Sequence, residues 1–207
     1  MREMRSPAAA AVLAEVAQGF TQLSESEKAS PPVIDAVAHA RFLRVEPAFQ
    51  DFIALHFHYS RQSELVRALK IKNARLGKLL EGYAEVVAIG NPTWSTASFE
   101  RIGEVYRNFN KGLLDAPTPR GLDAEQQELY RSTLEGQALP LEDKATEAFG
   151  KAIQVSQKSG VYSDWALKAQ DFLREYQPDA YGDLHRPRLM DTELSSMAAP
   201  DFTGGGH

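Results

Sequence analysis

The chain has 207 residues, of which 43% are hydrophobic and 25% are charged, and its net charge is −5. This balance is typical of a globular protein and argues against wholesale disorder, while the acidic charge argues against nucleic acid as a partner. Cysteine is absent, which excludes disulfides, thiol nucleophiles and cysteine-ligated metals.

The N-terminal residues predict an amphipathic helix. Ser6 followed by Pro7 is a typical helix start, and the pattern continues to about residue 22. Two arginines before the alanine-rich stretch make it slightly similar to a secretory signal, but Glu15 and Gln18 interrupt the apolar run. A fragment of a longer, exported protein would have the same pattern, so the compartment stays open. No apolar run in the sequence approaches the roughly 18 residues of a membrane span.

Two further helices are expected before residue 90. The first starts at Ser30-Pro31-Pro32 and continues to about Phe57. It contains Pro47, which should kink the helix or split it in two. The second covers about residues 62–89, because one side of its helical wheel carries a continuous apolar set. That set is Leu65, Val66, Leu69, Leu76, Leu80, Tyr83 and Val87.

The second half of the chain begins after a turn at Gly90-Asn91-Pro92, with Thr93 or Ser95 as candidate helix caps. A helix is expected at 94–114, with an apolar side, and a loop with two prolines at 115–123. No segment predicts a convincing strand, so the chain is expected to be all-helical, with about seven or eight helices. The remaining helices are expected at 124–136, 142–158 and 162–176.

Gly103 interrupts a strong helix pattern. Glycine inside a helix costs about 1 kcal/mol relative to alanine, so we expect this position to allow a neighbouring helix to approach closely. The surrounding sequence, Phe99-x2-Ile102-Gly103-x2-Tyr106, resembles the first helix of a tetratricopeptide repeat (TPR), and Ala145-x3-Phe149-x2-Ala152 resembles the second. The predicted packing residues are Gly103, Tyr106, Ala145, Phe149 and Ala152.

The spacing of these two halves departs from the regular repeat. In a TPR unit of about 34 residues the halves are about nine residues apart, whereas here a long segment separates Tyr106 from Ala145. Either that segment contains an inserted helix, or the halves belong to different degenerate repeats. A looser copy of the first half occurs earlier, at Leu76-Gly77-x2-Leu80.

The order of sequence blocks carries a broader resemblance. Aromatic, glycine and proline residues recur from Tyr83 through Trp94 and Pro117-x-Pro119 to Tyr162-x2-Trp165. In this order the chain, over about residues 60–176, resembles the C-terminal helical region of large TPR proteins from myxobacteria and their relatives, some of which belong to the gliding-motility machinery. The resemblance implies a scaffold in a cell-envelope or periplasmic assembly, and it transfers no catalytic residue.

These patterns predict an all-α fold of degenerate TPR-like helical repeats, an alpha-alpha superhelix, with an irregular helical bundle as the alternative. Three regions are expected. Residues 1–60 form N-terminal helices, residues 61–176 form the TPR-like region, and residues 177–207 form an extended or disordered tail.

A cluster of basic residues is the most informative surface feature of the sequence. Six cations but only one acid, Glu64, occur from Arg61 to Lys78. Four of the cations fall on one side of the predicted helix, largely opposite the leucines, where they could bind an acidic peptide, an anionic lipid head group or another domain. The alternative is a solvated face balanced by acids on an adjacent helix. The four candidate partner-binding residues, called the basic ridge below, are Arg67, Lys70, Arg75 and Lys78.

Catalytic and metal-binding patterns are absent from the sequence. The pair His56-Phe57-His58 would point to different sides of a helix and could not hold one ion. There is no phosphate-binding or dinucleotide-binding glycine motif and no nucleophile motif. We therefore expect no catalytic residue, no metal and no cofactor. The predicted function is a non-enzymatic scaffold for protein–protein interaction. The alternatives are a helical-bundle enzyme or small-ligand binder with an interior pocket and, less favoured, a protein of anionic membrane surfaces.

Overall fold

The fold is known from a computed structural model of the chain, which describes residues 16, 19–57 and 62–178. These residues form helices and contain no strand, so the all-α prediction is confirmed for the described part of the chain. Most of the helix expected from Ser6 and most of the expected tail lie outside the described residues; Val16 and residues 19–22, the described part of that expected helix, are helical. The helices are α2 (Glu25–Lys28), α3 (Pro31–Ile53), α4 (Gln62–Val87), α5 (Pro92–Leu114), α6 (Ala124–Ser159) and α7 (Asp164–Tyr176).

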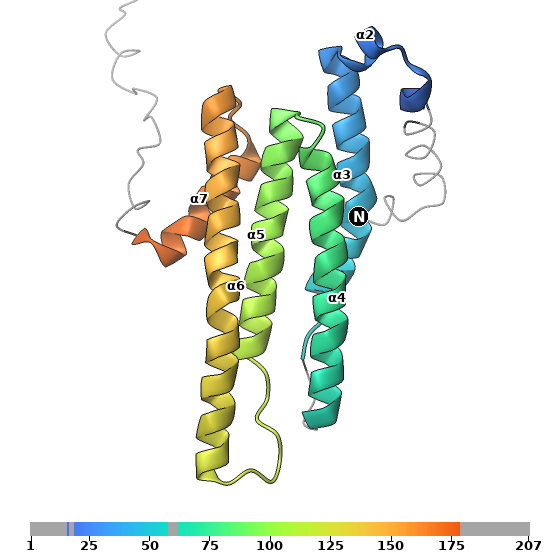
Figure 1. The fold of residues 1–207 in the computed structure, drawn as a ribbon. Helices are drawn as coiled ribbons and strands as arrows, with labels where there is room; N and C mark the ends of the chain where they lie inside the picture. Colours follow the sequence, from blue (N-terminus) through green and yellow to red (C-terminus); the bar gives the residue numbers. More distant parts are fainter. Residues whose placement is uncertain (1–15, 17–18, 58–61, 179–207) are drawn as a thin grey trace, which may run out of the picture.

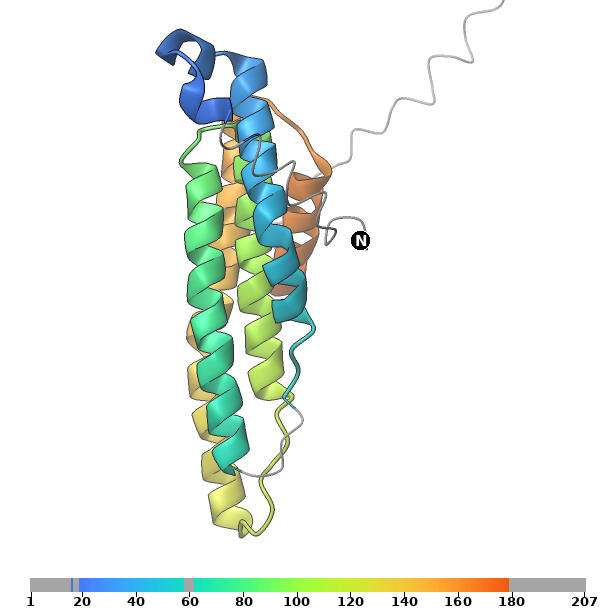
Figure 2. The same cartoon turned by 90° about the vertical axis from the view of Figure 1, so that its right-hand side faces the viewer.

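The four long helices, α3 to α6, run side by side in alternating directions, and the short α7 lies obliquely against α5 and α6 (Figures 1 and 2). The middle helix, α5, contacts α3, α4, α6 and α7, and its contact with α6 is the most extensive between any two described helices. In contrast, α4 and α6 lie on either side of α5 and make no comparable contact with each other. As a result, α5 is covered on most of its faces.

Local sequence signals account for where the helices begin and end. The side chain of Asn91 caps α5 by accepting a hydrogen bond from the Trp94 N–H at 3.1 Å, and Pro92 occupies the first turn. The expected caps, Thr93 and Ser95, already lie within this helix. At the same end of the bundle, α6 stops at Gly160, whose φ of 68° is the left-handed conformation that ends many helices.

Two prolines, Pro47 and Pro140, lie inside long helices of the structure. Pro47 lies within α3, which is a single helix of 23 residues. Pro140 lies within α6, so the prediction of separate helices at 124–136 and 142–158 is wrong: one helix of 36 residues covers both. A proline removes one helical hydrogen bond at a cost of about 3 kcal/mol, and the long contact with α5 outweighs this cost.

One continuous core joins α3 to α7. It is rich in aromatic residues, among them Phe42, Phe52, Tyr83 and Phe149, each at most 2% exposed. The apolar side expected for α4 was partly wrong, because Val66 is 44% exposed. The buried side of α4 is rotated toward the contact with α3 and α5, and consists of Leu65, Ala68, Lys72, Leu76, Leu79, Tyr83 and Val86.

Helix lengths differ from those of a regular TPR unit. Two helices and a turn share about 34 residues in that repeat, whereas α6 alone has 36 residues and α5 has 23. The looser repeat match on α4 also lacks the expected packing, because Gly77 is exposed and a Cβ added there would meet no atom within 4 Å. Helices α3 to α6 are therefore long and antiparallel, unlike the short helix pairs of a regular repeat.

Candidate functional site

The basic ridge lies on the solvent side of α4. Arg67, Lys70, Arg75 and Lys78 are all exposed, while Leu65, Leu76 and Leu79 on the other side of the same helix are at most 6% exposed. The buried side anchors α4 against α3 and α5. The four charges are thus presented to solvent from a helix that the core holds in place.

No carboxylate neutralises the basic ridge within the described part of the chain. The sequence has no aspartate or glutamate from Leu65 to Leu80. None of the four ridge residues forms an ion pair with a described residue. The ion pair of Glu85 with Arg44 of α3, at 2.9 Å, lies nearer the C-terminal end of α4. The ridge is therefore a local cationic strip in a chain of net negative charge.

Lys72 belongs to the same run of cations but has a different place. It is 1% exposed, and its Nζ donates hydrogen bonds to the Leu55 carbonyl at 2.8 Å and to Asn108 Oδ1 at 2.7 Å. The rings of Phe52, Phe57 and Phe109 surround the ammonium group at 4.8 to 5.8 Å. Burial lowers the pKa of Lys72 to about 8. A signal was present in the sequence, since Lys72 lies seven residues from both Leu65 and Leu79, which are buried.

The five predicted packing residues meet where α5 lies against α6. A Cβ added to Gly103 would clash with the Phe149 ring, at 2.6 Å from Cδ1 and 2.7 Å from Cζ. Ala145, Phe149 and Ala152 are fully buried. Tyr106 is 8% exposed, and the Lys144 ammonium lies 5.6 Å from the centre of its ring. These residues shape the contact between two helices and leave no reactive group exposed.

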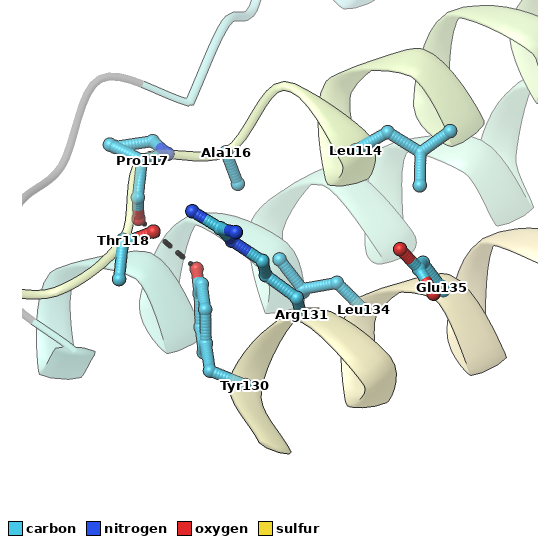
Figure 3. A pocket seen from close by; sticks show the side chains of 8 residues that line it. All are labelled: Leu114, Ala116, Pro117, Thr118, Tyr130, Arg131, Leu134 and Glu135. Carbon is cyan, nitrogen blue, oxygen red and sulfur yellow. Dashed lines mark hydrogen bonds between the residues drawn. The ribbon is translucent and has the colours of Figure 1, made fainter. Parts of the chain in front are cut away.

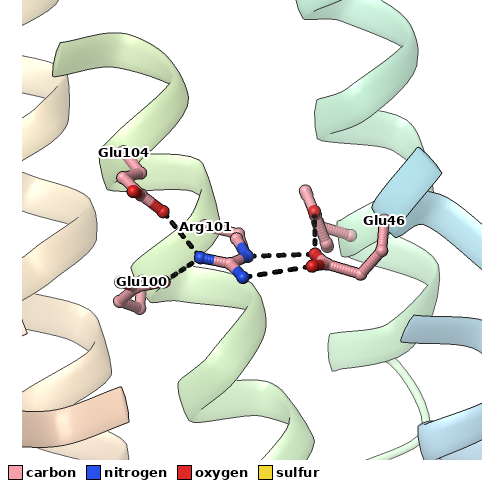
Figure 4. A network of polar contacts seen from close by, with 5 residues as sticks. Glu46, Glu100, Arg101 and Glu104 are labelled. Carbon is pink, nitrogen blue, oxygen red and sulfur yellow. Dashed lines mark hydrogen bonds and ion pairs between the residues drawn. The ribbon is translucent and has the colours of Figure 1, made fainter. Parts of the chain in front are cut away.

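A buried charged cluster joins α3 to α5, and sequence reasoning did not find it. Arg101 Nε and Nη2 bind the two carboxylate oxygens of Glu46 at 3.0 and 3.1 Å, and Nη1 binds Glu104 at 2.7 Å (Figure 4). The Tyr83 hydroxyl on α4 donates to Glu46 at 2.8 Å. Burial, and then the Glu46 carboxylate, raise the pKa of the Tyr83 phenol. The guanidinium also stacks on Trp165 of α7, so this cluster links four helices.

Glu100 lies beside this cluster and is incompletely paired. It is 1% exposed, its Oε2 is 3.4 Å from Arg101, and its Oε1 has no hydrogen-bond partner. Burial, reinforced by the Glu104 carboxylate, raises the pKa of Glu100 to about 8. Because Glu46 and Glu100 are at most 4% exposed, a substrate could reach them only if the helices moved apart. The cluster is therefore suited to joining helices.

A surface pocket of about 350 Å³ lies where the α5–α6 loop crosses α6 (Figure 3). The Tyr130 hydroxyl donates to the Pro117 carbonyl at 3.2 Å and holds the loop against the helix. Arg131 and Glu135 place opposite charges around the pocket, and Leu114 and Leu134 provide apolar walls. Its volume is within the range of small-molecule sites.

The described residues contain no group of three or more histidine, aspartate or glutamate side chains that could hold a metal ion. His39 stacks on Trp94, with ring centres 4.0 Å apart. His56 follows the end of α3 instead of lying within the helix as expected, and His58 lies outside the described residues. In the same part of the chain, no helix is both long and apolar enough to cross a membrane.

Comparison with known proteins identifies no relative. No protein-family model, curated protein or solved structure gives a significant match to the chain.

Proposed function

We propose that this protein is a non-enzymatic helical scaffold that binds an acidic segment of a protein partner through the basic ridge. One observation carries the proposal: four exposed cations occur together on one helix, and no described carboxylate pairs with them. Complementary charge steers a partner to such a surface and sets its orientation. The buried side of α4 supports this role, because a fixed helix keeps the four charges in one arrangement.

A TPR-like arrangement is the finer form of this proposal. The fit of Phe149 against Gly103 supports it, because a small residue on one helix receives an aromatic ring from the next, as the repeat requires. The resemblance to TPR proteins of the gliding-motility machinery would place the scaffold in a cell-envelope assembly.

The ridge proposal is tested by binding of proteins from an extract of the native source. We expect the wild-type chain to retain a partner in low salt and to release it in high salt, because salt screens exposed charges. Neutralising the ridge with Arg67→Gln, Lys70→Gln and Lys78→Gln should abolish this retention. A matched variant removes the same charge elsewhere, at exposed residues outside the ridge. Its substitutions are Lys111→Gln, Arg120→Gln and Lys158→Gln.

The two variants separate specific binding from a general charge effect. Retention by the matched variant and loss by the ridge variant would support the proposal, provided circular dichroism shows that both variants remain helical. Equal retention by all three proteins would reject the ridge as the binding surface. A wild type that retains no protein but binds vesicles of anionic lipid, together with a ridge variant that does not bind them, would instead favour the membrane-surface alternative.

The pocket beside Tyr130 supports a second candidate function, the binding of a small ligand. Its opposite charges, Arg131 and Glu135, above apolar walls would suit a molecule that carries both a cation and an anion. A thermal-shift screen with free amino acids and common cofactors tests this candidate. Saturable stabilisation that Arg131→Gln removes would support it, and no shift with any compound would count against it.

A further inference from the structure

An acidic strip on α6 is the second surface of uncompensated charge. Glu125, Glu128, Glu135 and Asp143 are exposed. Glu125 and Asp143 lie opposite the buried residues Leu134 and Ala138 of α6, while Glu135 lies nearer the edge of that buried side. None of these four acids forms an ion pair with a described residue. Between Ala124 and Asp143 the only cation is Arg131. We call these four acids the acidic strip.

Exposed apolar side chains accompany both charged surfaces. Leu129 and Leu139 are 68% and 62% exposed beside the acidic strip. On α4, Val66 and Ile71 are 44% and 41% exposed beside the basic ridge. Salt easily screens an attraction between charges alone. Apolar side chains among the charges would strengthen a contact, because their surface would be buried when the two surfaces meet. The two surfaces are therefore complementary in composition: each combines exposed apolar side chains with charges, and the charges are of opposite sign.

The acidic strip is longer than the basic ridge. At 1.5 Å per residue, the ridge from Arg67 to Lys78 extends about 16 Å and the strip from Glu125 to Asp143 extends about 27 Å, so the strip is long enough to cover the whole ridge. Within one molecule they do not meet, because α4 and α6 lie on either side of α5 and no ion pair joins these two helices in the described chain (Figure 1). Each surface of one copy is thus free to meet its complement on another.

We propose that the basic ridge of one copy of this chain binds the acidic strip of a second copy. This inference rests on the proposed function, since it names the partner of the ridge as another copy of the chain. The two surfaces differ, so the contact is heterologous, and repetition of it joins copies head to tail into a ring or an open filament.

The test is analytical ultracentrifugation of the full chain at rising concentration. The wild type should associate in low salt and dissociate in high salt. The ridge variant described above, and a strip variant with Glu125→Gln, Glu128→Gln and Glu135→Gln, should each remain monomeric. An equimolar mixture of the two variants should form a one-to-one complex and nothing larger, because one variant keeps an intact strip and the other keeps an intact ridge.

A matched acid variant provides the control. Asp51→Asn, Asp115→Asn and Asp171→Asn remove the same charge from exposed positions away from the strip, and this variant should associate like the wild type. A monomeric wild type at every concentration in low salt would overturn the inference, as would a strip variant that still associates.

The same variants distinguish this inference from the proposed function. If the strip variant retains a partner from the extract while the ridge variant loses it, and the wild type stays monomeric, the ridge binds a different protein and only the self-association is rejected.

Discussion

At Gly103 the absence of a side chain is a packing requirement. The helix loses about 1 kcal/mol by having glycine in place of alanine, but a methyl group there would overlap the ring of Phe149, which is fully buried. Overpacking of this kind typically costs about 1–3 kcal/mol, and Phe149 has little room to move because its ring is also stacked on Phe172 at 4.8 Å.

We therefore predict that Gly103→Ala lowers the free energy of unfolding by up to about 2 kcal/mol, because the cost of overpacking exceeds the gain in helix propensity; urea denaturation measures the change. The matched control is Gly136→Ala, because Gly136 lies within α6, is exposed, and has no atom near an added Cβ. There the gain in helix propensity should raise stability by up to about 1 kcal/mol. Stabilisation by both substitutions would show that the gap at Gly103 is not needed.

The buried carboxyl of Glu100 predicts a dependence of stability on pH. Its pKa is about 8 in the folded chain and near the ordinary value of 4.5 when unfolded. Between these values the folded state holds a proton that the unfolded state has released. The stability from this group is therefore fully present below about pH 4.5, falls as pH rises, and is lost above about pH 8.

Glu100→Gln cannot ionise and should lack this dependence. Relative to the wild type, the variant should gain stability as pH rises from about 5 to about 8, on the order of 1 kcal/mol for each pH unit, and level off above. Urea denaturation across this range measures the difference. Glu125→Gln, at an exposed position, should follow the wild-type profile. Parallel profiles for wild type and Glu100→Gln would contradict the assignment.

At the scale of the helix, Pro140 is an exposed residue inside α6 that lowers the stability of the helix. We predict that Pro140→Ala raises the free energy of unfolding by about 2 kcal/mol, because proline is about 3 kcal/mol worse than alanine inside a helix and stiffens the unfolded chain by about 1 kcal/mol or less. Pro92→Ala is the control. Since Pro92 occupies the first turn of α5, where proline fits, that change should bring no gain. A loss of stability with Pro140→Ala would show that the proline shapes the α5–α6 contact.

The helical character of the chain and most helix ends could be predicted from the sequence. Which polar residues become buried between helices could not. Periodicity and the Gly90 turn located α4 and α5 well, because local preferences determine them. Pro140 misled the prediction of α6, since tertiary packing outweighs a local penalty. Lys72 and Glu100 were missed because their polarity predicts exposure, and only the contacts of α4 with its neighbours and of α5 with four helices bury them. The exposed ridge could be predicted, since its side of α4 has no partner helix.

At the scale of the whole molecule, α5 contacts most of the other helices. Its residue Arg101 adds charged contacts to this otherwise apolar packing. Its guanidinium pairs with Glu46 of α3, lies 4.3 Å from the ring centre of Phe49 and 4.7 Å from that of Trp165 on α7, and has a side chain only 13% exposed. A buried ion pair adds little net stability compared with an apolar substitute, but removal of one partner strands the other charge. The fold therefore depends on both charges being present together.

Arg101→Met should consequently destabilise the fold by about 3–5 kcal/mol, because it leaves the Glu46 carboxylate buried without its cation. Adding Glu46→Gln removes the stranded charge, so the double variant should be more stable than Arg101→Met alone, and the two effects should fall short of additivity by about 1–3 kcal/mol. Urea denaturation of the four proteins gives this coupling. A control pair, Arg44→Met with Glu85→Gln, tests an exposed ion pair between α3 and α4, where coupling should be below about 1 kcal/mol. Additive effects at Arg101 and Glu46 would mean that solvent reaches the cluster and that apolar packing alone unites the helices.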